Sequence, residues 1–155
     1  MQRRYKLVAT GGTFDVLHRG HLALLQKAFE VSESVIIGVT SDKLAVERGK
    51  QIHNNYDTRI ANLSKLLDGM FKNQRYEIKQ LNEDFGPALY TNNVEALIAS
   101  KETAHKGTLL NKLRGEKGLK PVDVVTVDLI LAKDGKRISS TRIRSGEIDA
   151  EGNLL

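Results

Sequence analysis

Short apolar runs alternate along this chain with segments whose apolar residues recur every three to four positions. Runs typical of buried β-strands occupy residues 5–10 (YKLVAT), 34–40 (SVIIGVT), 94–100 (VEALIAS) and 121–132 (PVDVVTVDLILA), and residues 75–81 (RYEIKQL) alternate as a strand does. The run at 121–132 is the strongest of these patterns. The run at 94–100 also suits a helix, but its place in the alternation favours a strand.

Three segments carry the period of one helix face. Leu22, Leu25 and Phe29 predict a first helix, and four apolar residues (Ile60, Leu63, Leu67 and Met70) predict a helix over 56–71 with Asp57 and Arg59 in its first turn. A third helix is expected over 101–118, with Leu109, Leu110 and Leu113 facing inward and Gly115 and Gly118 closing it. Residues 41–55 are polar and basic, as in a loop or loose helix, and 82–93 suit a loop with one helical turn.

The order of these elements predicts the fold class. A strand, a helix and a second strand within about forty residues form a βαβ unit, which requires parallel strands and a right-handed crossover. No repeat, linker or low-complexity tract divides the chain. We therefore expect one α/β domain over residues 1–155, a Rossmann-like doubly wound parallel sheet of about five strands.

Composition and charge narrow the range of binding partners that we expect. At 155 residues, with 40% hydrophobic and 28% charged residues, the chain suits one globular domain. It has no cysteine, no apolar run of membrane-spanning length and no signal-peptide pattern, so we expect a cytoplasmic protein without a membrane partner. The net charge of +5 favours anionic partners. Because basic and aromatic residues are not clustered together, we expect small polyphosphates and no nucleic acid.

The first candidate motif, residues 11–21 (GGTFDVLHRGH), joins the first strand to the first helix. Its two glycines permit a tight turn and a close ligand, and the free N–H groups at the helix start are expected to hold phosphate. His18 and His21 lie three apart and so share a face, with Gly20 keeping the approach open. A lone histidine is more often merely packed. Zinc is disfavoured because the chain has no cysteine and no third ligand nearby.

The second candidate motif, residues 138–144 (ISSTRIR), follows the last strand and an Asp134-Gly135 turn. Ser139 or Ser140 is expected to cap a short helix that runs through Ile143, and the tail beyond it is polar. Capping is compatible with phosphate binding, since a helix start leaves more donors than one cap uses. The carboxyl ends of parallel strands share one rim of the sheet, so both motifs should meet around one triphosphate.

Together the two motifs resemble the paired signatures of the nucleotidyltransferase superfamily, Gly-Thr-Phe-Asp with His-x-Gly-His and Ile-Ser-Ser-Thr-x-x-Arg. Further segments, at 38–44 (GVTSDKL), 56–60 (YDTRI), 100–103 (SKET) and 111–114 (NKLR), are similar to the pantetheine-phosphate adenylyltransferases of the archaeal and eukaryotic branch. This resemblance covers residues 5–144. It implies the joining of ATP and 4′-phosphopantetheine to give dephospho-coenzyme A and pyrophosphate in coenzyme A biosynthesis, with Mg²⁺ accompanying ATP.

The resemblance also implies roles for individual residues. The nucleotide-binding set is Gly11, Gly12, Thr13, Phe14, Asp15, Ser139, Ser140 and Thr141. The catalytic set is His18, His21, Arg144 and a lysine. That lysine is Lys43 by distance from the strand end, or Lys50 by its place in the cluster of basic residues that precedes the segment YDTRI. A phosphate acceptor is already ionised, so the transfer needs neither a Ser-His-Asp arrangement nor paired carboxylates, and positioning and charge stabilisation suffice.

Three alternatives stay open. Cytidylyltransferases usually carry Arg-Thr-Glu-Gly where this chain has Lys136-Arg137, and nicotinamide-mononucleotide adenylyltransferases usually carry a proline within the segment Asp15-Val16-Leu17. Both departures favour the pantetheine interpretation. A non-enzymatic nucleotide- or RNA-binding module is the third alternative, and the intact histidines and serines argue against it. Oligomeric state and feedback by coenzyme A cannot be inferred from these residues.

Overall fold

A five-stranded parallel sheet with the strand order β3-β2-β1-β4-β5 forms the centre of the computed structural model, which describes residues 4–83, 85–86, 88 and 91–155. The strands are β1 (Tyr5–Gly12), β2 (Ser32–Thr40), β3 (Arg75–Leu81), β4 (Ala96–Ser100) and β5 (Asp123–Val127). All four strand pairings are parallel. The predicted parallel sheet of about five strands is confirmed.

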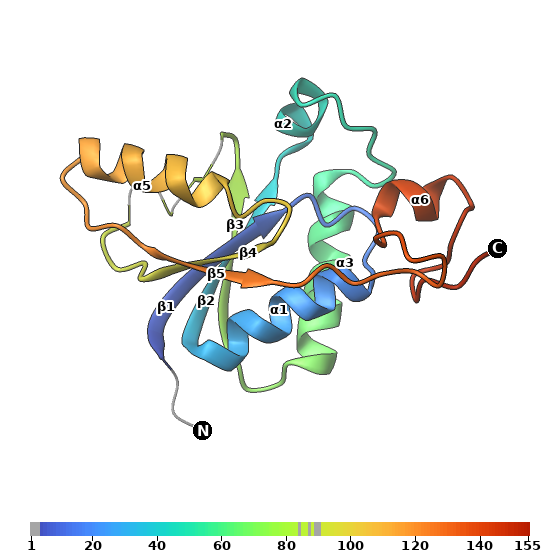
Figure 1. The fold of residues 1–155 in the computed structure, drawn as a ribbon, viewed down its shortest axis with the longest axis horizontal. Helices are drawn as coiled ribbons and strands as arrows, with labels where there is room; N and C mark the ends of the chain where they lie inside the picture. The colour runs from blue at the N-terminus through green and yellow to red at the C-terminus, as the bar shows by residue number, and fades with distance from the viewer. Residues whose placement is uncertain (1–3, 84, 87, 89–90) are drawn as a thin grey trace.

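Helices cover both faces of this sheet (Figure 1). Val8 and Val35 point to the face covered by α1 (Arg19–Val31) and α3 (Tyr56–Met70), and form the larger core with them. Ala9 and Ile36, one position along, point to the opposite face and pack with α5 (Lys106–Glu116). Strands buried on both faces read as continuous apolar runs, which explains the sequence pattern and confirms the doubly wound architecture.

The strand order creates a crevice beside β1. From β1 the chain moves outward to β2 and β3, then returns to the other side of β1 for β4 and β5. Connections on either side of this point run to opposite faces, so the carboxyl ends of β1 and β4 leave a space between them. Two short helices, α2 (Asp42–Glu47) and α6 (Ser140–Arg144), lie in the connections that follow strand ends. The candidate motifs therefore gather at this rim.

The predicted strand over 121–132 is wrong in length, because β5 spans only Asp123–Val127. A strand extends as far as its partner, and β5 pairs only with β4, from Ala96 opposite Asp123 to Ser100 opposite Val127. Beyond that point Leu131 forms an isolated antiparallel bridge with Arg137. The strand predicted at 94–100 is confirmed as a strand, although it begins at Ala96.

The predicted helix over 101–118 is also too long, because α5 begins at Lys106. Residues 101–105 form turns instead, in which the Lys101 N–H donates to the Val127 carbonyl (3.1 Å). Two apolar positions of the predicted helices are exposed. Leu109 is 47% exposed, so its predicted inward packing is wrong, and Met70, which the helical period grouped with Leu63 and Leu67, is 60% exposed.

The buried faces of the two helices explain that difference. In α5 the buried positions are Gly107, Leu110 and Arg114, and in α3 they are Arg59, Leu63 and Leu67. Each set follows the helical period, but each includes an arginine that hydropathy alone excludes from a core.

The remaining segments add two short features. The segment predicted as a loop at 82–93 includes residues outside the described ones, and 41–55 contains the six-residue helix α2. In the tail, Ile148 is fully buried and packs with Ala132 and Ile138 in a small separate core. Over the described residues, no helix has both the length and the apolar character needed to cross a membrane.

Candidate active site

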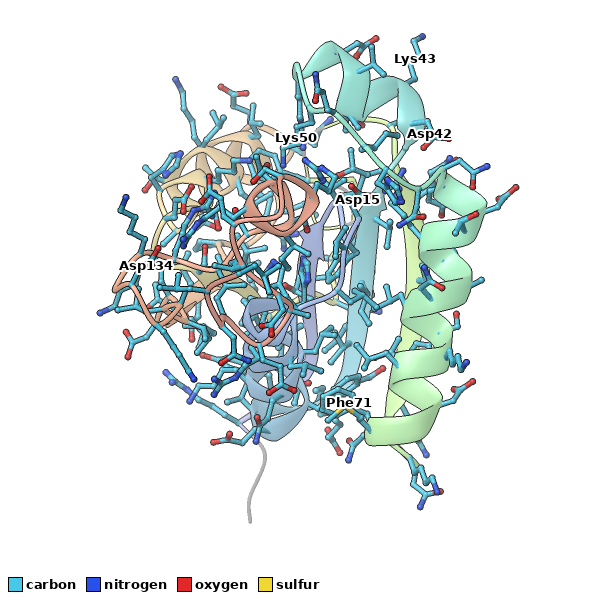
Figure 2. The ribbon with its side chains drawn as sticks, turned by 90° about the vertical axis from the view of Figure 1, so that its right-hand side faces the viewer. Asp15, Asp42, Lys43, Lys50, Phe71 and Asp134 are labelled. Atoms are coloured by element: carbon cyan, nitrogen blue, oxygen red, sulfur yellow. The ribbon has the colours of Figure 1, made fainter. Side chains whose placement is uncertain are left out.

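A cavity of about 700 Å³ opens at the carboxyl ends of β1 and β4. Twelve of the thirteen residues proposed from the sequence line it: Gly11, Gly12, Thr13, Phe14, Asp15, His18, His21, Lys50, Ser139, Ser140, Thr141 and Arg144. Lys43 does not line it; its side chain lies on the outer side of α2, whereas Lys50 lies nearer the strand ends (Figure 2). Of the two candidate lysines, only Lys50 is placed with the rest of the site.

The two sequence motifs are joined directly, although 124 residues separate the contacting pair. The Ser140 hydroxyl donates to the Val16 carbonyl (2.8 Å) and accepts from the Val16 N–H (3.2 Å). Ser139 is the N-cap of α6, where its hydroxyl accepts the Arg142 N–H (3.2 Å). The hydroxyl of Ser139 thus caps α6, while that of Ser140 binds the backbone of the first motif.

Asp15 makes a second connection between the motifs. Its carboxylate is almost fully buried and accepts a hydrogen bond from the Arg144 guanidinium. It also accepts the backbone N–H groups of His53 and Asn54, each at 2.9 Å. The carboxylate therefore holds Arg144 and the loop before α3 in place. The sequence suggested nucleotide binding for this residue, and its geometry is that of a positioning group.

The start of α1 differs from the expectation of free N–H groups. His18 is the N-cap; its Nδ1 accepts the Gly20 N–H (3.0 Å), and the N–H groups of His21 and Leu22 both donate to its carbonyl. The Arg19 N–H donates to the Ala150 carbonyl (3.3 Å). All the donors of this helix start are used within the protein, so that expectation is wrong. Donors for a ligand at this position must come from the imidazoles.

The imidazoles have the geometry to donate. The His21 Nδ1 accepts the His18 N–H (3.2 Å), and the two rings stack with their centroids 4.0 Å apart. Because both Nδ1 atoms accept a backbone proton, the single proton of each neutral ring is carried on Nε2. Both side chains line the cavity. The pair can present Nε2–H donors to a ligand there.

Burial keeps both rings neutral. It lowers the pKa of His18 to about 4, with a further contribution from Arg137. It lowers the pKa of His21 to about 3, with His18 and Lys50 contributing in the same direction. A lowered histidine pKa means that the neutral form prevails at pH 7. These histidines can therefore act as hydrogen-bond donors without carrying charge.

Gly20 is required by the position of the His18 ring. A Cβ atom on Gly20 would lie 2.8 Å from His18 Cε1 and 3.0 Å from His18 Nδ1. Real Cβ atoms essentially never make contacts shorter than 3.0 Å. The sequence interpretation, in which glycine keeps the approach to the histidines open, thus has a specific steric cause.

Five of the described cationic residues line the cavity; Lys50 and Arg144 were proposed from the sequence, and Arg48, Lys106 and Arg137 were not. The Lys50 Nζ donates to the Thr13 hydroxyl (3.3 Å). Burial lowers the pKa of Lys50, and the neighbouring charges of Arg48, Lys106 and Arg137 lower it further. Cations gathered closely enough to disfavour one another's charge form a site that an anion would stabilise.

Arg59 is a structural residue that hydropathy could not reveal. Its side chain is fully buried, and its Nη1 donates to the carbonyls of Thr13 and Thr40, both at 2.7 Å. Its Nε donates to the Asn54 carbonyl (3.1 Å), and its Nη2 pairs with Asp42 (2.8 Å). The carbonyls of Thr13 and Thr40 lie at strand ends, where parallel strands leave backbone groups unpaired. The sequence offered one signal for this role: Arg59 lies in the first turn of the predicted helix 56–71, beside the strand ends.

The cavity is amphipathic. Part of its lining is apolar and includes Ile36, Leu81, Phe85, Ala88 and Leu97. The cations and histidines described above also line it. A ligand that carries phosphate groups together with a less polar arm matches such a lining.

The carboxylates at the cavity do not form a metal cluster. Over residues 4–83, 85–86, 88 and 91–155, no group of three or more His, Cys, Asp or Glu side chains could hold a metal ion. Among these described residues, the two aspartates that line the cavity are paired, Asp15 with Arg144 and Asp128 with Lys101 (2.7 Å).

Comparisons with known proteins find related sequences and a related fold. Residues 9–146 match the cytidylyltransferase-like family. A phosphopantetheine adenylyltransferase of Methanothermobacter thermautotrophicus is 41% identical over 155 residues, covering 100% of this chain and 93% of the relative. One from Pyrococcus furiosus is 43% identical over 158 residues, covering 100% and 97%. A crystal structure of an Archaeoglobus fulgidus protein of unknown function has a TM-score of 0.71 and 31% identity, over 79% of this chain and 89% of that one.

Proposed function

The chain belongs to the cytidylyltransferase-like family and, within it, to the phosphopantetheine adenylyltransferases, and from this membership we propose how its cavity works. The enzyme is a nucleotidyltransferase that joins ATP and 4′-phosphopantetheine. The products are dephospho-coenzyme A and pyrophosphate, in coenzyme A biosynthesis. We place the reaction in the cytoplasm.

One observation carries this proposal: the direct junction of the two motifs around a single cationic cavity. Ser140 bonds both backbone groups of Val16, and Asp15 bonds Arg144, so the histidines and the second motif border one space. An isolated phosphate site would not need this arrangement. A reaction in which one phosphorus changes partners does, because donors must surround it on several sides.

The transfer itself requires no base. A phosphate oxygen of 4′-phosphopantetheine, already ionised, attacks the α-phosphorus of ATP and forms the new phosphoanhydride bond. The bond from the α-phosphorus to its bridging oxygen breaks, and pyrophosphate leaves with that electron pair. The protein's task is to hold attacking and leaving oxygens in line and to stabilise the charge that develops.

We assign that stabilisation to the neutral imidazoles and two cations. The Nε2–H of His21, with that of His18 beside it, donates to non-bridging oxygens of the transferred phosphate. Lys50 and Arg144 stabilise the negative charge of the leaving pyrophosphate. Thr13 and Thr141 lie next to these cations, since Lys50 donates to the Thr13 hydroxyl and Arg144 donates to that of Thr141 (3.2 Å).

Magnesium fits this site as part of the ATP complex. The cavity carboxylates of Asp15 and Asp128 are engaged by cationic side chains, and Mg²⁺ commonly keeps its waters and binds through substrate phosphates. When bound, the ion offsets charge on the phosphate chain. Lys50 and Arg144 keep their roles on the remaining oxygens.

The decisive assay measures pyrophosphate release from each nucleoside triphosphate against a panel of acceptors that includes 4′-phosphopantetheine. We expect turnover with ATP and 4′-phosphopantetheine and recovery of dephospho-coenzyme A in equal amount. Turnover that required CTP, or nicotinamide mononucleotide as acceptor, would replace the proposal with one of its rivals. Retention of RNA without any turnover would point to a binding module.

A further inference from the structure

Arg137 occupies a position in the cavity that neither motif includes. It directly precedes the second motif in the chain, and its side chain, about half exposed, lines the cavity with His18 and Lys50. Its charge acts on both of these residues, lowering the pKa of His18 and that of Lys50. The guanidinium is thus electrostatically coupled to the residues that we assign to the phosphates.

Arg142 fixes the backbone of Arg137 through a hydrogen bond. The Arg142 Nη1 donates to the Arg137 carbonyl (2.9 Å), and its Nη2 forms an ion pair with Asp134 in the same turn. Its Nε pairs with Glu147 (2.8 Å), which ties this turn to the segment after α6. The Arg142 side chain is only 14% exposed and does not line the cavity. Arg142 therefore fixes the backbone of this turn and does not itself face the ligand.

Glu102 engages the Arg137 guanidinium in an ion pair. The Nη1 of Arg137 lies 2.8 Å from the Glu102 carboxylate, and these side chains are 50% and 46% exposed. Glu102 lies in the turn after β4, and Arg137 lies in the segment before α6. A pair exposed to this degree gains little stability from its attraction, so an incoming polyphosphate can exchange with the carboxylate at small cost.

We propose that Arg137 is a further polyphosphate-binding residue, positioned by Arg142, and that Glu102 is the anion it releases when the nucleotide binds. The inference rests on the proposed function for the identity of the ligand. Each phosphate oxygen that replaces Glu102 forms a charge-assisted bond with a guanidinium whose planar fork suits phosphate. Glu102 thereby lowers nucleotide affinity, and with it the affinity for the pyrophosphate product.

Binding measured by calorimetry without the acceptor tests this directly. Arg137→Ala should weaken ATP binding about tenfold, since one charge-assisted bond is lost, and should leave AMP binding unchanged because AMP lacks the β- and γ-phosphates. Glu102→Gln should tighten ATP binding roughly threefold in the otherwise native protein. The same substitution should have no effect when Arg137 is already alanine. Arg142→Ala should weaken ATP binding too, and should add nothing to Arg137→Ala.

A matched control comes from the far edge of the sheet. Glu77 on β3 pairs with Lys79 at the same 2.8 Å and is similarly exposed, but neither residue lines the cavity. Glu77→Gln should leave ATP affinity unchanged. The inference is overturned by native ATP affinity in Arg137→Ala, by an equal loss of AMP affinity, or by a Glu102→Gln effect that persists without Arg137. A native protein that binds ATP but forms no dephospho-coenzyme A contradicts the proposed function and leaves this inference standing.

Discussion

Replacing Gly20 with alanine should reduce catalysis while leaving the fold almost as stable as before. The new Cβ would lie 2.8 Å from His18 Cε1, whereas ordinary van der Waals contact begins at 3.4 Å. The imidazole is the side that must yield, because Gly20 is fixed within α1. A displacement of this size moves the Nε2–H of His18 and disturbs the stacked His21 ring, whose centroid lies 4.0 Å away.

Gly20→Ala has two opposing effects on the free energy of unfolding, and these nearly cancel. Alanine in place of glycine within a helix stabilises by about 0.5–1 kcal/mol. Loss of the His18 cap, which accepts the Gly20 N–H at 3.0 Å, costs about 0.5–2 kcal/mol. The free energy of unfolding should therefore change by at most about 1.5 kcal/mol. A misplacement of about 1 Å at a reacting centre can cost about 100-fold, so we expect kcat to fall by about 10- to 100-fold.

Urea unfolding and steady-state turnover measure the two effects separately, and Gly69→Ala supplies the control. Gly69 lies in α3 with nothing within 4 Å of its would-be Cβ, so alanine there should stabilise by about 0.5–1 kcal/mol with unchanged kinetics. Native kcat in Gly20→Ala would refute the steric argument. A loss of several kcal/mol of stability would show that the substitution damages the fold and not the ring position.

Three further expectations follow from the site geometry. Lys50→Ala should lower kcat/KM for ATP by about 100-fold, and Lys43→Ala, outside the cavity, should not change it; equal effects would contradict this placement. Ser140→Ala removes both hydrogen bonds to Val16 and should lower the free energy of unfolding by about 1–3 kcal/mol and raise KM for ATP. An unchanged KM would contradict the role of Ser140 in joining the two motifs. Burial lowers the pKa of His18 to about 4 and that of His21 to about 3, so the folded state binds fewer protons than the unfolded state between pH 6.5 and about 3. Stability should therefore be complete above pH 6.5 and fall with acidification. Acid titration of His21→Gln should show a smaller loss, and an identical loss would remove that histidine from the account.

The sequence predicted the sheet and the place of the site because both depend on local patterns. Parallel strands buried on both faces appear as apolar runs, and the two motifs follow strand ends, so their meeting needed only the rule for parallel sheets. The length of β5 was missed because it is set by its partner β4, which no local pattern encodes. Leu109 was misplaced because consecutive leucines fit more than one helical phase.

The finer structure of the site depends on contacts that only folding creates. Free N–H groups were expected at the start of α1, but the imidazole of His18 takes one of them, which transfers the donor role to the ring nitrogens. Asp15 was grouped with the nucleotide ligands, yet two backbone N–H groups and Arg144 surround its carboxylate. Arg59 had no predicted role, because its partners are carbonyls brought together from three segments.

The tautomer and charge of the two cavity histidines test the central claim most directly. Two-bond ¹H–¹⁵N correlation spectra of the ¹⁵N-labelled protein, with His18→Gln and His21→Gln variants for assignment, report both properties at once. We predict that His18 and His21 are neutral, with the proton on Nε2, from pH 7 down to about pH 5. An imidazolium at pH 7, or a proton on Nδ1, would contradict the claim that neutral imidazoles donate to the transferred phosphate.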